Sequence, residues 1–214
     1  MAPHYKVTYF DLNAVGEPIR VLLSYGGLEF EDIRVKFKDW PSLKPKMPYG
    51  QVPILECDGK VAHQHIAICR YLAKKLKLTG KDDWEDLMID STVDTVNDLR
   101  TKIIKSYYEP DPSLRKKLFK TVLDETIPYY IERLEAQAKA NGGFLAVPKL
   151  TWADVYFTSF IEFLNAHVEK DILANAPNLQ AVKNKVWAVP NVKKWMDKRP
   201  QTFKLADFPQ PSKE

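Results

Sequence analysis

The hydrophobic pattern changes once along this chain, and that change restricts its fold more than any other feature. Up to residue 76, short β-branched and aromatic segments alternate with segments whose apolar residues recur at helical spacing. After the polar segment 77–83, which contains Gly80, every patterned segment is helical. We therefore expect a small α/β domain over residues 1–78 and an all-helical domain over residues 82–214.

The first part predicts four strands and two helices. Strands are expected at residues 4–10, 30–37, 53–57 and 60–63, and helices from Pro18 to a stop at Gly26-Gly27 and at residues 65–76. A proline-rich loop over residues 40–48 separates the second strand from the third. This order gives βαβ followed by ββα, a complete small α/β unit.

The second part predicts only helices, at residues 84–108, 114–140, 152–167, 177–188 and 191–198. Pro128 should kink the second of these, because proline removes one hydrogen bond of the helix and crowds the preceding turn. Residues 151–154 form a Thr-x-x-Asp capping signature before a segment that is apolar nearly all round. We expect that third helix to be the buried centre of its domain.

Composition argues against several classes of function. The 32 basic and 28 acidic residues are interspersed, which does not suit a nucleic-acid-binding surface. No apolar run approaches the roughly 18 residues of a membrane helix, and residues 1–4 show no signal-peptide pattern. The two cysteines, Cys57 and Cys69, lack the C-x-x-C spacing of a redox or zinc site. We expect a cytoplasmic protein that binds neither nucleic acid nor membrane.

The segment around Val52 and Pro53 predicts a binding site for a short peptide. Pro53 heads a strand, a place where a missing N–H is tolerated. If the bond between the two residues is cis, the main chain of Val52 points into a cleft and can pair with an extended peptide. Gln64 and the helix that begins near His65 offer an anion site beside it. The combination suits a small acidic peptide.

Seven short segments, taken in order and spacing, resemble one family. They are residues 6–10, 16–20, 39–41, 48–56, 63–64, 70–72 and 150–154. Together they cover nearly the whole chain, and they are similar to cytosolic glutathione transferases, most closely to the sigma class found in insects. The resemblance implies the GST fold: a thioredoxin-like N-terminal α/β domain with the order βαβαββα, which binds glutathione, and an all-α C-terminal domain that forms the electrophile pocket.

The resemblance also implies an activity and partners. Such an enzyme activates glutathione, its co-substrate, as the thiolate and conjugates it to small hydrophobic electrophiles. Reduction of lipid hydroperoxides and isomerisation of prostaglandin-like endoperoxides use the same thiolate. A homodimer is implied, and no metal is expected.

Tyr9 ends the first strand and, by the resemblance, is the catalytic residue. Taken alone, a tyrosine at a strand end is more often a core ring with a hydrated hydroxyl. In this family the matching tyrosine donates its O–H to the glutathione sulfur. A thiol with a pKa of about 8.5 needs about 2.7 kcal/mol to be mostly ionised at cytosolic pH. A hydrogen bond to a charged acceptor contributes about 1.5–3 kcal/mol, so one neutral donor is sufficient.

The resemblance assigns the other glutathione contacts one residue at a time. Trp40 and Lys44 would donate to the glycine carboxylate, Val52 would pair with the cysteinyl backbone, and Gln64 would contact the γ-glutamyl end. The full set implied is Phe10, Trp40, Lys44, Gly50, Gln51, Val52, Pro53, Gln64, His65 and, from the partner subunit, Asp98.

His65 departs from the family pattern, which usually has serine or threonine at this position to cap the helix and bind the γ-glutamyl carboxylate. Histidine is a poorer cap, by about 1 kcal/mol. We expect the imidazole to keep the role, with a pH dependence between pH 6 and 8 that serine would not show. A metal site formed by His63, His65 and Cys69 is a less favoured alternative.

Asp90, Asp94 and Asp98 follow one another at i, i+4 and i+8, so they share a helix face on which like charges repel. They are either a solvated acidic face or a cation site, and some relatives bind a divalent cation here. Asn97 replaces one of the acids, which argues against the metal. Val15 stands where mammalian sigma-class members have arginine. Insect-type members commonly have an apolar residue at this position.

The electrophile pocket is less well defined by the sequence. Candidates by position are Leu12, Asn13, Leu99, Ile103, Tyr107, Phe163 and Phe203, with Phe10 beside them, although a single residue of these types is more often a core residue. The tail over residues 203–208 either covers the pocket or hangs free.

Two other functions fit the same fold. A non-catalytic carrier of apolar ligands or a lens-protein-like structural form is the first, and retention of Tyr9, Trp40, Lys44 and Gln64 argues against it. A thiol–disulfide oxidoreductase is the second, and the lack of a cysteine near residue 9 argues against it.

Overall fold

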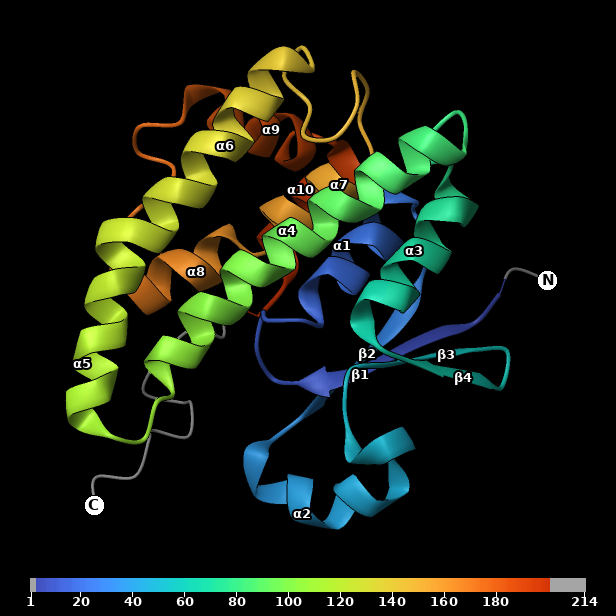
Figure 1. The fold of residues 1–214 in the computed structure, drawn as a ribbon. Helices are drawn as coiled ribbons and strands as arrows, with labels where there is room; N and C mark the ends of the chain where they lie inside the picture. The colour runs from blue at the N-terminus through green and yellow to red at the C-terminus, as the bar shows by residue number, and fades with distance from the viewer. Residues whose placement is uncertain (1–2, 201–214) are drawn as a thin grey trace.

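The structure, a computed structural model that describes residues 3–200, contains one four-stranded mixed sheet (Figure 1). Its strands are β1 (Tyr5–Phe10), β2 (Phe30–Val35), β3 (Ile54–Cys57) and β4 (Lys60–His63), in the order β2-β1-β3-β4. β1 is parallel to β2 and antiparallel to β3, and β3 is antiparallel to β4. Because β1 lies between β2 and β3 and is mostly buried, its carboxyl end holds Tyr9, Phe10 and the loop after them in a defined position.

Helices cover both faces of this sheet. On one side, α1 (Glu17–Tyr25) and α3 (His65–Leu76) pack together between the sheet and the second part of the chain (Figure 1). On the other side lies α2 (Trp40–Leu43), a short helix flanked by 3₁₀ turns within the expected proline-rich loop. The expected order βαβαββα is confirmed.

The second part of the chain is helical throughout, as expected. Its helices are α4 (Asp83–Tyr107), α5 (Pro112–Thr121), α6 (Ile127–Ala140), α7 (Trp152–Thr158), α8 (Ile161–Val168), α9 (Pro177–Trp187) and α10 (Pro190–Lys198). Every residue of α7 is buried, because α1, α3, α4 and α9 all contact it. The expectation that this helix forms the centre is confirmed.

The predicted capping signature fixes the start of α7. Asp154 Oδ2 accepts hydrogen bonds from the Thr151 backbone N–H at 2.8 Å and the Thr151 hydroxyl at 3.1 Å. Its other oxygen accepts from the Leu145 N–H at 2.7 Å. Burial raises the pKa of Asp154, and these hydrogen bonds oppose the rise. One carboxylate therefore ties the helix start to the loop before it.

One predicted helix is interrupted, and another is continuous but contains a π segment. The helix expected at 152–167 is broken after Thr158, where the Thr158 and Ser159 hydroxyls donate to the carbonyl oxygen of Val155 at 3.2 and 2.7 Å. Side chains that bond back to the preceding turn bend and end helices. The helix expected at 114–140 contains a π segment, Val122–Thr126, immediately before α6. Pro128 lies in the first turn of α6, so the predicted distortion falls upstream of the proline.

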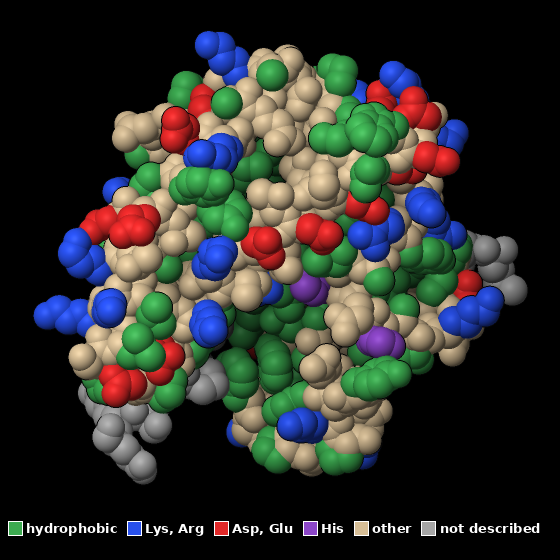
Figure 2. All heavy atoms as spheres, viewed as in Figure 1, with side chains coloured by type: hydrophobic (Ala, Val, Ile, Leu, Met, Phe, Trp, Pro, Cys, Tyr) green, Lys and Arg blue, Asp and Glu red, His purple; other side chains and the backbone are tan. Residues whose placement is uncertain are grey.

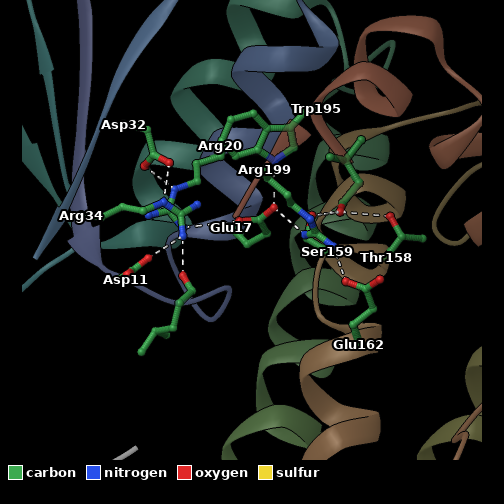
Figure 3. Close-up of polar contacts among 12 residues, drawn as sticks. Asp11, Glu17, Arg20, Asp32, Arg34, Thr158, Ser159, Glu162, Trp195 and Arg199 are labelled. Atoms are coloured by element: carbon green, nitrogen blue, oxygen red, sulfur yellow. Dashed lines mark hydrogen bonds and ion pairs between the residues drawn. The ribbon is translucent and has the colours of Figure 1, made fainter. Parts of the chain in front are cut away.

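A buried polar cluster joins the two parts (Figure 3). Glu17 begins α1, and its carboxylate accepts from Trp195 Nε1 at 2.9 Å and from Arg199 Nη1 at 2.7 Å. Arg20, one turn further along α1, donates to Asp32 of β2 at 2.7 Å and to the Leu12 carbonyl oxygen at 2.9 Å. The cluster thus holds α10, α1 and the loop after β1 in one arrangement.

No helix within residues 3–200 is long and apolar enough to span a bilayer.

Candidate functional site

Tyr9 lies at the carboxyl end of β1, with its side chain almost fully buried. The ring packs so closely on Gly16 that a Cβ atom there would lie 2.4 Å from Tyr9 Cδ1, so only glycine fits. Burial raises the pKa of Tyr9 to about 12, while the charges of Arg20 and Arg100 and a hydrogen bond from the Val15 backbone oppose the rise. The hydroxyl is therefore protonated at neutral pH. The Val15 N–H uses only a lone pair of the oxygen, and within residues 3–200 the Tyr9 O–H donates to no other group, so it is available to a ligand.

Aromatic rings connect the end of β1 to α2. Phe10 stacks on Phe37 with ring centroids 4.7 Å apart and meets Trp40 edge-on at 5.1 Å. Lys44 follows Trp40 by one helical turn, and its side chain lies against Gly50, whose Cβ would sit 3.3 Å from Lys44 Cγ. The structure therefore brings Tyr9, Phe10, Trp40, Lys44 and Gly50 into one region.

The peptide bond between Val52 and Pro53 is cis, the condition on which the sequence argument for a peptide site depended. Pro53 is buried, Val52 is half-buried and Gln51 is exposed, so the bond lies where the chain enters β3. Gln64 lies just before α3, is exposed and has a positive φ of 70°. Figure 2 shows a hollow lined with hydrophobic side chains between the α2 region and the helices above it, with histidine side chains near its edge.

His65 is the first residue of α3, and its ring is turned toward α7. Its Nε2 lies 3.0 Å from the Tyr156 hydroxyl, and the two rings are stacked with centroids 6.0 Å apart. Burial and the charge of Arg100 lower the pKa of His65 to about 4. The expected titration between pH 6 and 8 is therefore wrong for the unliganded protein, because the ring is already neutral at pH 6.

The acidic ladder on α4 is not one unit. Asp90 accepts two hydrogen bonds from Arg70 Nε, at 2.9 and 3.0 Å, whereas Asp94 and Asp98 are exposed. The Asn97 side-chain oxygen accepts hydrogen bonds from Arg100, so it is not available as a ligand for a metal ion. Within residues 3–200, no three His, Cys, Asp or Glu side chains are arranged to hold a metal ion. The alternative site at residues 63, 65 and 69 is thereby contradicted.

Several electrophile-pocket candidates are core residues. Leu99 and Ile103 are 0% exposed, so neither side chain is accessible to solvent, and their place in the electrophile pocket stays a prediction. Phe163 is buried against His167, with centroids 4.3 Å apart. Leu12 and Asn13 are buried in the loop after β1, where Asn13 Oδ1 has no hydrogen-bond partner. Phe203 lies outside the described residues.

Tyr108, which the sequence analysis did not name, lies beside Tyr107, with ring centroids 5.1 Å apart. Burial, followed by the neighbouring Tyr107 and by Tyr9, raises the pKa of Tyr108 to about 12. Tyr107, which the sequence suggested instead, meets the buried His167 edge-on at 4.8 Å.

Comparison with known families decides the assignment. The model for the glutathione S-transferase N-terminal domain matches residues 5–74, and the model for the C-terminal domain matches residues 97–199. The chain belongs to the glutathione S-transferase family. A glutathione S-transferase from Anopheles gambiae is 52% identical over 94% of this chain and 98% of its own length. Glutathione S-transferase S1 of Drosophila melanogaster is 48% identical over 92% of this chain and 80% of its own.

Among solved structures, the same glutathione S-transferase fold is found in one described as prostaglandin synthase D of Nilaparvata lugens. It superposes with a TM-score of 0.89 at 47% sequence identity, covering 92% of this chain and 98% of that chain. The likeness therefore extends over both the α/β part and the helical part of this chain.

Proposed function

We propose that this protein is a glutathione transferase in which Tyr9 stabilises the thiolate of bound glutathione, which then attacks a small hydrophobic electrophile. The observation that carries the proposal is the state of Tyr9: a buried, neutral hydroxyl whose proton is free, at the open end of the central strand. One hydrogen bond from such a donor supplies the roughly 2–3 kcal/mol that thiol ionisation needs. Holding the thiolate beside the electrophile supplies the remaining acceleration.

Glutathione would lie between α2 and the start of α3. Its glycine carboxylate would meet Trp40 and Lys44, and its cysteinyl backbone would pair with Val52 as an added strand does. Its γ-glutamyl end would lie at Gln64 and His65. Gln51 and Pro53 would shape the approach. Residues 1–78 would form the glutathione-binding domain and residues 82–214 the domain that completes the electrophile pocket.

The same proposal includes a homodimer of the sigma class in the cytoplasm. Tyr49 supports the dimer: it is 84% exposed in the loop before β3, with its ring beside that of His63. Trp84 and Leu87, at the start of α4, are 69% and 53% exposed. Contiguous patches of such side chains are typical of interaction surfaces. Asp98 of each subunit would reach the glutathione bound by the other.

The dimer is tested by light scattering on the Tyr49→Lys variant. A lysine there should shift the dimer to monomers, while the matched variant Tyr129→Lys, at a 54% exposed tyrosine on α6, should not. A wild-type protein that is monomeric at micromolar concentration would contradict the proposal.

Prostaglandin chemistry is a second candidate activity. The observation in its favour is the 47% identity to the structure described as prostaglandin synthase D. A thiolate that attacks an endoperoxide oxygen would start the isomerisation at the same site. Conversion of a prostaglandin endoperoxide that depends on both glutathione and Tyr9 would support it, and conversion equal to the uncatalysed rate would refute it.

The transferase proposal is tested by retention on immobilised glutathione followed by turnover of a chloronitrobenzene. We expect retention and turnover for the wild type, and retention with a turnover loss of about 10- to 100-fold for Tyr9→Phe. Retention without turnover would favour the non-catalytic carrier, and neither retention nor turnover would refute a glutathione site.

A further inference from the structure

A pocket of about 330 Å³ lies in the helical part, between α6 and the segment that joins α8 to α9. Figure 1 shows this part of the molecule far from the sheet and α2. The lining of the pocket shares no residue with the proposed glutathione site or with the electrophile candidates. It is therefore a separate place on the molecule.

Hydrogen bonds hold both walls of this pocket in place. Glu135 of α6 accepts from the backbone N–H groups of Asn178 and Leu179, each at 2.9 Å, which ties the start of α9 to α6. In the joining segment, the side-chain oxygen of Asn165 accepts from the Ile172 N–H at 3.0 Å. The pocket is thus formed before a ligand arrives, as small-molecule sites usually are.

The floor of the pocket is apolar. Ile127 and Ile172 line it and are 8% and 6% exposed, and Ile131 beside them is half-buried. An apolar cavity of about 150 Å³ is large enough for one benzene ring. A volume of about 330 Å³ therefore admits a ring with a short alkyl chain.

Three carboxylates at the rim have acceptor capacity left. Glu132 is 83% exposed, and within residues 3–200 no group donates to Oδ2 of Asp171, whose Oδ1 accepts from the Leu173 N–H. Oε2 of Glu135 accepts from the Leu179 N–H alone, so it keeps a lone pair. Burial disfavours the charge of Glu135, but the hydrogen bonds from the start of α9 outweigh it and hold the pKa of Glu135 below its ordinary value.

Pro128 leaves a further acceptor in the wall. The N–H of Ile127 donates to the carbonyl oxygen of Val122, five residues earlier. At the same spacing, residue 128 would donate to the carbonyl oxygen of Leu123, but proline has no N–H. Because Leu123 and Pro128 both line the pocket, this carbonyl lies in its wall.

Positive charge is scarcer than negative charge in the lining. Among the described residues, Lys170 is the one basic residue that lines the pocket, and it is exposed. Arg133 of α6 lies 3.9 Å from Glu132 but does not line the pocket, and its guanidinium sits over the Tyr129 ring, 3.5 Å from the centroid. The lining thus carries three carboxylates and one ammonium.

We propose that this pocket binds a hydrophobic monoamine, with the apolar part on the isoleucines and the ammonium among Glu132, Glu135 and Asp171. An ammonium has three N–H donors and no acceptor, which matches a rim rich in acceptors. The three carboxylates are not arranged to hold a metal ion, so a divalent cation does not fit. Binding here is separate from the transferase reaction.

Three probes of one shape and different charge test this site. They are phenylbutylamine, phenylbutanol and phenylbutyrate, each titrated into the full-length protein in a calorimeter. The amine should bind at least about tenfold more tightly than the acid, with the alcohol between them. The amine should leave the KM for a chloronitrobenzene unchanged, because the pocket shares no residue with the electrophile candidates.

Four variants locate the bound amine. Ala174 is an exposed alanine in the lining, so Ala174→Phe should fill the pocket and weaken the amine at least about tenfold. The matched control is Ala136→Phe, at an exposed alanine of α6 outside the lining, which should keep the affinity. Glu132→Gln should weaken the amine about two- to fivefold, and Lys170→Gln should strengthen it by a similar factor.

Equal affinity of the wild type for the amine and the acid would overturn the inference. An amine affinity that Ala174→Phe leaves unchanged would do the same. If Ala174→Phe does not fold, the opposite shifts of Glu132→Gln and Lys170→Gln decide, and equal affinities in these two variants would count against the site. Binding calorimetry needs no turnover, so this failure is distinguishable from a failure of the transferase proposal.

Discussion

Glu17 offers the sharpest test of what holds the two parts of the molecule together. Its carboxylate accepts from Trp195 and Arg199 and lies 3.4 Å from Arg20 Nη1 (Figure 3). The side chains of Glu17, Arg20 and Arg199 are 0%, 0% and 2% exposed. The substitution Glu17→Gln keeps the shape and the accepting oxygen but removes the one negative charge that both buried cations share.

The magnitude follows from what each cation retains. Removing one partner of a buried ion pair costs about 3–5 kcal/mol, because a charge is left uncompensated. Arg20 keeps Asp32 and Arg199 keeps Glu162, so the lower end, about 3 kcal/mol, applies. For a chain of this size each kcal/mol lowers Tm by about 2–4 °C, so we expect a fall of about 6–12 °C.

Differential scanning calorimetry measures this fall, with Glu162→Gln as the control. Glu162 also pairs with Arg199 but is 48% exposed, so its loss should cost less than about 1 kcal/mol. The double variant Glu17→Gln/Arg199→Met removes both charges and should be more stable than Glu17→Gln alone. A Tm within 2 °C of wild type for Glu17→Gln, or a double variant that is less stable than the single one, would refute the reasoning.

Three further predictions concern stability and the shape of the site. The pKa of His65 is about 4 in the folded protein and about 6.5 when unfolded, so the unfolded state binds more protons between these values. The stability contribution is therefore complete above about pH 6.5 and is lost as the pH falls toward 4; urea titrations should show a loss of about 2 kcal/mol from pH 7 to pH 5 that His65→Asn removes. Thr151→Ala should lower the free energy of unfolding by about 1–2 kcal/mol in the same titrations, through loss of the α7 cap, and an unchanged urea midpoint would contradict the capping role. Gly16→Ala should displace the Tyr9 ring, because the new Cβ would lie 2.4 Å from it; we expect at least a tenfold fall in kcat/KM with glutathione retention kept, and normal turnover would contradict the close packing.

The sequence predicted the order of strands and helices because local signals carried it. Pro53 restricted where β3 begins, glycines ended α1, and Thr151 with Asp154 marked the start of α7. The break between α7 and α8 was missed because the Ser159 hydroxyl bonds a backbone carbonyl that an uninterrupted helix would also contain. The pattern of apolar residues does not show whether a serine hydroxyl bonds to water or to a backbone carbonyl of its own helix.

The site was predicted less completely, because its details depend on contacts between distant segments. Residues on or near β1 and α2 were located by position, and the structure does bring Tyr9, Phe10 and Trp40 together. The partner of His65 could not be predicted, since Tyr156 lies 91 residues away. The ring is buried beside Tyr156 and near Arg100, which lowers the pKa of His65 to about 4 instead of leaving it between 6 and 8.

The central claim is that Tyr9 donates a hydrogen bond to the glutathione thiolate. It is tested most directly by titrating the ultraviolet absorbance of the thiolate in the complex of glutathione with the wild type and with Tyr9→Phe. We predict a thiol pKa about 1–2 units below the free value of about 8.5 in the wild-type complex, and a value near 8.5 in the Tyr9→Phe complex. The same thiol pKa in both complexes would contradict the account.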